Sequence, residues 1–202
     1  MSERQISELA GALTRHQHHF GKMSTDDRQW VIQNTEAAIG LFADAVKNRA
    51  ATEVKKRLKF IRPVSLSAIP EFIAADKFRE GKTIDGIKVA WLGKNFKTNF
   101  LNKKEPAALA LDMREHELVI RSRDPAIITE LGGERQVETT LGQFWEFLKT
   151  ADQTLVHVRH IKDMDGVLWA VFGYWDDDGL RVGAHPLGHP YAWSVGRRFL
   201  SR

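Results

Sequence analysis

The chain contains no cysteine among its 202 residues. This absence excludes disulfide bonds, thiolate metal sites and cysteine nucleophiles together, and it is typical of proteins from a reducing compartment. Long apolar runs are also missing, because the longest, Val167 to Trp175, is far too short to cross a bilayer as a helix. The first twenty residues carry charges throughout and lack the apolar segment of a secretion signal. We therefore expect a soluble, cytoplasmic protein with no membrane partner.

Recognisable reaction motifs are absent as well. There is no G-x-S-x-G nucleophile elbow, and the segment from Trp91 to Asn95 lacks the first glycine of a phosphate-binding loop. Asp163 and Asp165 precede an apolar run, where a calcium loop would need further oxygen ligands. We therefore expect no metal and no cofactor, and the sequence favours a non-catalytic protein over an enzyme.

The N-terminal third has the periodicity of an amphipathic helix. Ser24 and Asp27 match a capping box, in which the serine hydroxyl accepts a backbone N–H of the first turn. Apolar residues then recur at three- and four-residue spacing from Trp30 onward, and the pattern extends to Leu58. Because Pro63 disfavours helical geometry in the residue before it, we expect the helix to end by there. A domain boundary is therefore predicted between residues 62 and 63.

The C-terminal third predicts strands. Asp-Gly pairs at 165–166 and 178–179 are typical of tight turns, because both residue types tolerate positive φ. Between them, Val167 to Trp175 is apolar at both alternating sets of positions, which predicts a central strand covered on both faces. A last strand is predicted from Tyr191 to Phe199. The expected fold class is α+β, with a helical segment of residues 1–62 packed on a mixed domain of residues 63–202 that ends in an antiparallel β-meander.

Aromatic residues and histidines gather in this last third, which holds three of the six tryptophans, both tyrosines and four of the eight histidines. His157 and His160 lie on a predicted strand, where they point to opposite faces and cannot chelate a metal together. Each of His185 and His189 precedes a proline, which holds its backbone extended. Tryptophan, tyrosine and arginine are favoured as interface anchors. The candidate ligand- or partner-binding residues are Trp175, His185, His189, Tyr191, Trp193 and Arg197.

Positive charge gathers in a different segment. The formal net charge is +4, and between Lys47 and Arg62 seven basic residues face one acid, Glu53. Such clustering is typical of a solvated helix face or of an anion-binding surface. The candidate anion-binding residues are Lys55, Lys56, Arg57, Lys59 and Arg62.

Three functional classes stay open on these grounds. The first is a soluble, non-catalytic binding or interaction module that uses the C-terminal aromatic-rich face, with a protein as the expected partner. The second is a nucleic-acid-binding accessory protein that uses the basic segment 47–62. The third is a hydrolase-type enzyme with His185 and His189 in its site. The first class is favoured because the other two lack diagnostic motifs.

Overall fold

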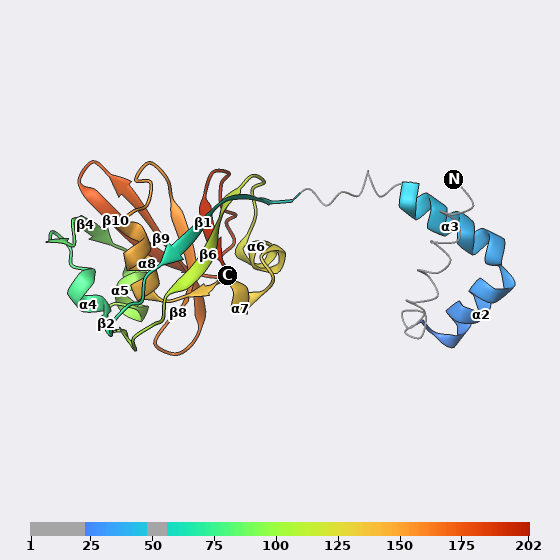
Figure 1. The fold of residues 1–202 in the computed structure, drawn as a ribbon, viewed down its shortest axis with the longest axis horizontal. Helices are drawn as coiled ribbons and strands as arrows, with labels where there is room; N and C mark the ends of the chain where they lie inside the picture. Colours follow the sequence, from blue (N-terminus) through green and yellow to red (C-terminus); the bar gives the residue numbers. More distant parts are fainter. Residues whose placement is uncertain (1–22, 48–55) are drawn as a thin grey trace. The chain divides into compact units, whose positions relative to one another are not determined.

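The computed structural model describes residues 23–47 and 56–202, and the chain divides between Lys55 and Lys56 into two units (Figure 1). The first unit contains helices α2 (Thr25–Gln33) and α3 (Thr35–Lys47). The predicted cap is confirmed, since the Ser24 hydroxyl accepts the backbone N–H of Asp27 at 3.1 Å. The chain leaves helical geometry at Asn34, so this region forms two helices where one was predicted.

The second unit begins at Lys56, which is earlier than the predicted boundary. Residues predicted to extend the helix form strand β1 (Leu58–Leu66) instead, so the helical prediction for Leu58 is wrong. Pro63 is accommodated because β1 is the edge strand of its sheet and pairs only with β6. A register shift between Phe60 and Arg62 interrupts the alternation that would have identified a strand.

The body of the second unit is a mixed nine-stranded sheet in the order β1-β6-β11-β8-β9-β10-β4-β3, with β7 beside β8. Strands β8, β9 and β10 are consecutive antiparallel neighbours. The last strand does not extend this series, because β11 lies between β6 and β8 and runs parallel to β8. The strands not yet given bounds are β3 (Thr83–Ile84), β4 (Ile87–Leu92), β6 (Leu111–Leu118), β7 (Glu138–Thr139), β8 (His157–Lys162), β9 (Leu168–Asp176), β10 (Gly179–Pro186) and β11 (Arg198–Ser201).

Five helices and a small second sheet complete this α+β unit. The helices are α4 (Ala74–Lys77), α5 (Lys94–Asn99), α6 (Asp124–Glu130), α7 (Glu134–Val137) and α8 (Leu141–Leu148), and the small sheet pairs β2 (Phe72–Ile73) with β5 (Lys104–Glu105). Helix α8 begins with a capping box at Thr140. None of the described helices is long and apolar enough to cross a membrane.

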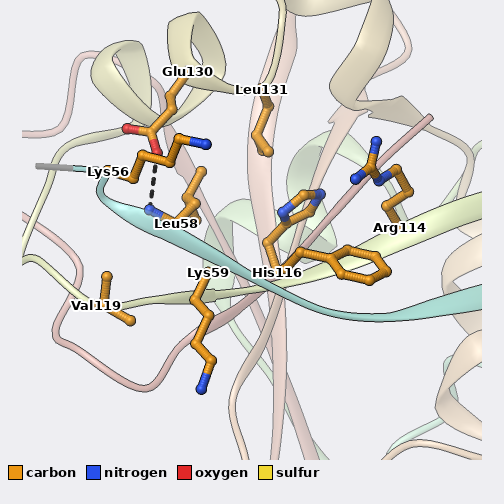
Figure 2. A pocket seen from close by; sticks show the side chains of 9 residues that line it. Lys56, Leu58, Lys59, Arg114, His116, Val119, Glu130 and Leu131 are labelled. Carbon is orange, nitrogen blue, oxygen red and sulfur yellow. Dashed lines mark hydrogen bonds between the residues drawn. The ribbon is translucent and has the colours of Figure 1, made fainter. Parts of the chain in front are cut away.

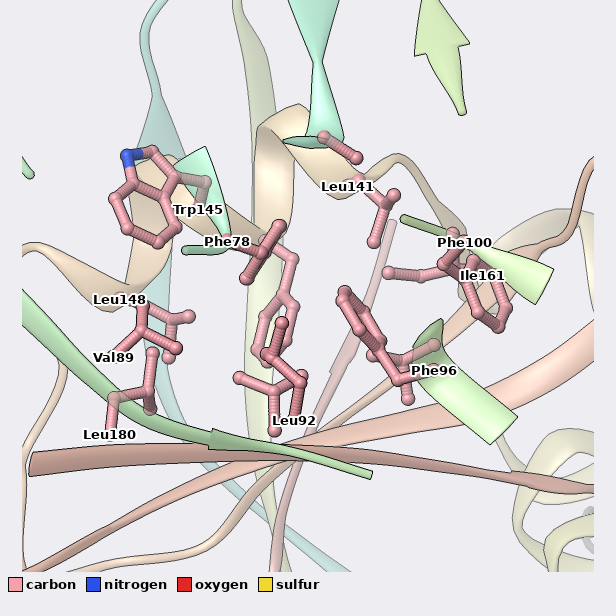
Figure 3. Packing of buried hydrophobic residues seen from close by; sticks show 14 of the residues in the cluster. Phe78, Val89, Leu92, Phe96, Phe100, Leu141, Trp145, Leu148, Ile161 and Leu180 are labelled. Atoms are coloured by element: carbon pink, nitrogen blue, oxygen red, sulfur yellow. The ribbon is translucent and has the colours of Figure 1, made fainter. Parts of the chain in front are cut away.

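Strand register divides the side chains of the large sheet between two faces. On the first, which we call the closed face, Val171 and Leu180 pack with Trp145 of α8 and with residues of α4 and α5 (Figure 3). The opposite face, which we call the open face, carries Phe172, Tyr174 and Arg181. Helices α6 and α7 pack on the open face beside β8 and β11, whereas these three side chains stay partly exposed.

Candidate functional site

The open face contains a pocket of about 260 Å³. Two of its residues project from β9 and one from β10, and most of the others belong to the connection between β10 and β11. Its lining is largely aromatic, with a single cation. The lining residues are Val156, Phe172, Tyr174, His185, Ala192, Trp193, Ser194 and Arg197.

The rings of this pocket contact one another in a fixed order. The His185 ring stacks on that of Trp193, with centroids 4.8 Å apart and planes 20° from parallel. The Phe172 ring contacts the same histidine at 4.8 Å and meets Trp193 edge-on at 5.6 Å. Phe172 can lie along the sheet because its neighbour on β10 is Gly183, where a Cβ would come 2.8 Å from Cε1 of the ring. The glycine therefore makes room for the wall of the pocket.

A buried carboxylate holds Trp193 in place. The Trp193 indole N–H donates to Asp124 Oδ1 at 2.9 Å, and His160 Nε2 lies 3.0 Å from the same oxygen. The backbone of Trp193 also pairs with that of Ser122 as an isolated β-bridge. A ring fixed by both its backbone and its polar atom loses little freedom when a ligand arrives, so this wall of the pocket is preorganised.

The pocket carries one uncompensated charge. Burial lowers the pKa of His185, and the neighbouring His189 lowers it further, so this imidazole is neutral near pH 7. The Arg197 guanidinium is half-buried and has no ion-pair partner among the described residues. Because arginine stays protonated at physiological pH, the pocket presents a positive charge beside aromatic rings.

Three of the predicted binding residues line this pocket: His185, Trp193 and Arg197. Two others lie beside it, since the His189 ring stacks on His185 at 4.6 Å and Tyr191, largely exposed, contacts His189 at 5.3 Å. The sixth predicted residue, Trp175, does not line the pocket. Strand alternation places it on the closed face, where it packs against the main hydrophobic cluster.

The sequence prediction did not include Phe172 and Tyr174 among the site residues. Both belong to the segment predicted as a strand covered on both faces, and that prediction holds only for its first half, where Ala170 and Val171 are buried. The alternation of the segment was a usable signal, because it placed residues 172 and 174 on one face. It did not indicate that this half of the face lacks a covering helix.

The basic segment does not form a single cationic surface. Lys55 lies outside the described residues, and Arg57 and Arg62 are paired with Glu130 at 3.6 Å and Glu115 at 2.7 Å. Lys56 and Lys59 border a hollow of about 540 Å³ beside β1 and β6, which Arg114 and His116 also line. Figure 2 shows the Lys59 side chain pointing to the other side of β1, away from Lys56 and Glu130. The charges of the segment are therefore partly neutralised and partly dispersed.

His185 and His189 lack the contacts that a hydrolytic site requires. His185 contacts rings, and the only hydrogen bond of the His189 ring in the described structure is at 3.4 Å from the backbone N–H of Tyr191. General-base catalysis instead needs an imidazole oriented by one group and within reach of a nucleophile or water. The His160–Asp124 pair has an orienting carboxylate, but both side chains are buried from solvent. No group of three or more histidine, aspartate or glutamate side chains in the described ranges is placed to hold a metal ion.

No protein-family model, curated protein or solved structure matches this chain.

Proposed function

We propose that this protein is a non-catalytic binding module and that the pocket of the open face is its ligand site. The ligand we propose is planar and carries a negative charge. The observation that supports this most is the combination of a preorganised aromatic wall, formed by Phe172, His185 and Trp193, with the unpaired guanidinium of Arg197. Flat rings favour stacking with a planar group, and a lone cation favours an anion.

Partial exposure supports a binding role for these rings over a purely structural one. Phe172, Tyr174, His185 and Trp193 all retain contact with solvent, whereas several aromatic residues of the closed face, such as Phe96 and Trp145, are fully buried. Exposed aromatic surface lined by a few polar groups is typical of ligand sites. Interfaces with proteins also favour tryptophan, tyrosine and arginine, so an aromatic and acidic segment of a partner protein has the same chemistry.

Nuclear magnetic resonance of the tryptophan indole N–H groups provides a direct test. The probe is adenosine 5′-monophosphate, which joins a planar ring to a phosphate, and adenosine is its uncharged counterpart. We expect the indole signal of Trp193 to shift on titration while that of Trp145, which is fully buried on the inner side of α8, stays unchanged. Assignment follows from tryptophan-to-phenylalanine variants.

Replacement of Arg197 distinguishes the contribution of the positive charge from that of the aromatic rings. Arg197→Gln should weaken binding of the monophosphate roughly ten-fold, as expected for loss of one charge-assisted hydrogen bond, and should affect adenosine less. Arg121→Gln serves as the matched control, because Arg121 is exposed and lies outside the pocket. Absence of a Trp193 shift with either probe, or an equal effect of both arginine variants, would contradict the proposal.

A further inference from the structure

The aromatic surface of the open face extends beyond the pocket. In the register of the sheet, Arg181 of β10 is the direct neighbour of Tyr174 on β9 and of Trp91 on β4. These three planar groups therefore form a row across three adjacent strands. Neighbouring strands lie about 4.8 Å apart, so the row spans roughly 10 Å from Trp91 to Tyr174.

Two local features place Trp91 in this row. The register of β4 against β10 shifts between Leu180 and Arg181, so that Val89 points to the closed face and Trp91 points to the open face. Its ring lies along the sheet over Gly93, where a Cβ would come 2.9 Å from Cη2 of the indole. Trp91 is consequently 40% exposed, which is unusual for so large an apolar side chain on a paired strand.

The charges near the row fall into two groups. The Arg181 guanidinium is held by Asp176 and Asp178, both at 3.2 Å, which neutralises it. By contrast, Lys88 and Lys94, which flank Trp91 in the sequence, are exposed and have no ion-pair partner in the part of the chain that the structure describes. Strand alternation places Lys88 on the open face, because its neighbours Ile87 and Val89 point to the closed face. Together, Lys88 and Arg197 give this face cations that are free to meet an anionic polymer.

We propose that the open face binds single-stranded nucleic acid. One base occupies the pocket beside Trp193, further bases stack on Tyr174 and Trp91, and the backbone phosphates meet Lys88 and Arg197. Stacking on flat rings requires unpaired bases, which excludes a duplex. The row extends about 10 Å from Tyr174 at the pocket to Trp91, which exceeds a single base and favours a strand over a mononucleotide. The inference rests on the proposed function for the pocket and adds the polymer and the Trp91 platform.

Fluorescence anisotropy with labelled thymidine oligonucleotides tests this inference. Affinity should rise with oligonucleotide length and exceed that for adenosine 5′-monophosphate, and it should fall as salt rises from about 50 to about 200 mM because bound phosphates release counterions. Trp91→Ala should weaken binding of the longer strands roughly ten-fold, as expected for loss of one stacked base. Phe60→Ala is the matched control, since Phe60 is 45% exposed on the distant edge strand β1 and should leave affinity unchanged.

The results that overturn the inference differ from those that overturn the pocket. If the mononucleotide shifts Trp193 but long strands bind no more tightly and Trp91→Ala has no effect, the strand proposal fails while the pocket stands. Equal affinity for a duplex of the same sequence also overturns it. Binding of a proline-rich peptide that depends on Trp91, with no oligonucleotide binding, would assign this face to a protein partner instead. If oligonucleotides bind without any shift of the Trp193 indole signal, only the proposal for the pocket fails.

Discussion

Both faces of the large sheet carry aromatic residues, but the surroundings of these residues differ between the two faces. On the closed face, Phe78, Phe96 and Trp145 are fully buried and meet one another at centroid distances of 4.9 and 5.0 Å (Figure 3). On the open face, Phe172 and Trp91 lie over glycines and keep part of their surface in solvent. Rings that pack against other elements stabilise the fold, whereas rings that lie along the backbone remain available to a ligand.

The closed face also contains the polar groups that are hardest to accommodate. Arg159 is fully buried over the Phe147 ring, and burial lowers the pKa of its guanidinium to about 9. Its Nη1 donates to the carbonyl of Val158 at 2.7 Å, but its Nε and Nη2 have no partner in the described structure. Glu115 and His157 lie in the same region, 3.8 Å apart. Buried charges of this kind contribute little net stability, so the closed face must be stabilised mainly by its apolar packing.

Truncation of one tryptophan on each face should affect stability very differently. Trp145→Ala should lower the free energy of unfolding by about 3–5 kcal/mol, because it leaves a cavity in a packed cluster and removes the hydrogen bond to Asp85. Trp91→Ala should change it by no more than about 0.5 kcal/mol, as is usual for exposed positions. Urea denaturation followed by circular dichroism measures both. Similar losses for the two variants would show that the faces do not differ as described.

The two faces should also differ in their response to acid. Burial, followed by repulsion from Arg159, lowers the pKa of His157 from 6.5 to about 4. Between these values the unfolded chain binds a proton that the folded chain does not, so stability is present above pH 6.5 and is lost as pH falls toward 4. The loss is at most about 3 kcal/mol. Denaturation at pH 7 and near pH 4.5 should show this slope in the wild type and a weaker slope in His157→Phe.

His185 on the open face provides the comparison for this acid response. Its pKa is also lowered by burial, but the side chain is only half-buried. His185→Phe should therefore remove less of the pH slope than His157→Phe does. A larger effect of the His185 variant would mean that the open face is more tightly packed than its exposure indicates.

A single glycine allows a test within the open face itself. Gly183→Ala places a Cβ against the Phe172 ring, and the displaced ring should cost about 1–3 kcal/mol of unfolding free energy, as in other overpacked sites. The same variant should abolish the Trp193 indole shift with adenosine 5′-monophosphate, because the wall of the pocket moves. Gly188→Ala is the control, since nothing lies within 4 Å of the added carbon. Loss of stability with unchanged ligand binding would separate Phe172 from the site.

Several elements were predictable because they depend on near neighbours in the chain. The cap at Ser24, helix α8, the turns at Gly166 and Gly179 and the strand that contains His157 all follow from spacing and turn chemistry. The prediction that His157 and His160 point apart is consistent with their separate partners, Glu115 and Asp124. Their complete burial was not predicted, because it depends on layers contributed by distant segments.

The local sequence was therefore sufficient for the type of these elements, for the α+β class and for the concentration of rings in the last third of the chain, but not for the start of β1, which was predicted as helix. It was not sufficient to predict which side chains of the sheet are buried and which stay exposed. Trp175 and Trp193 were equivalent as candidates, and they separate because alternation along β9 directs one to the core while Asp124 binds the other beside the pocket. Trp91 points to the open face only because of a register shift of β4 against β10. Exposure of a side chain depends on which distant strands and helices surround it, and short-range periodicity carries no information about those neighbours.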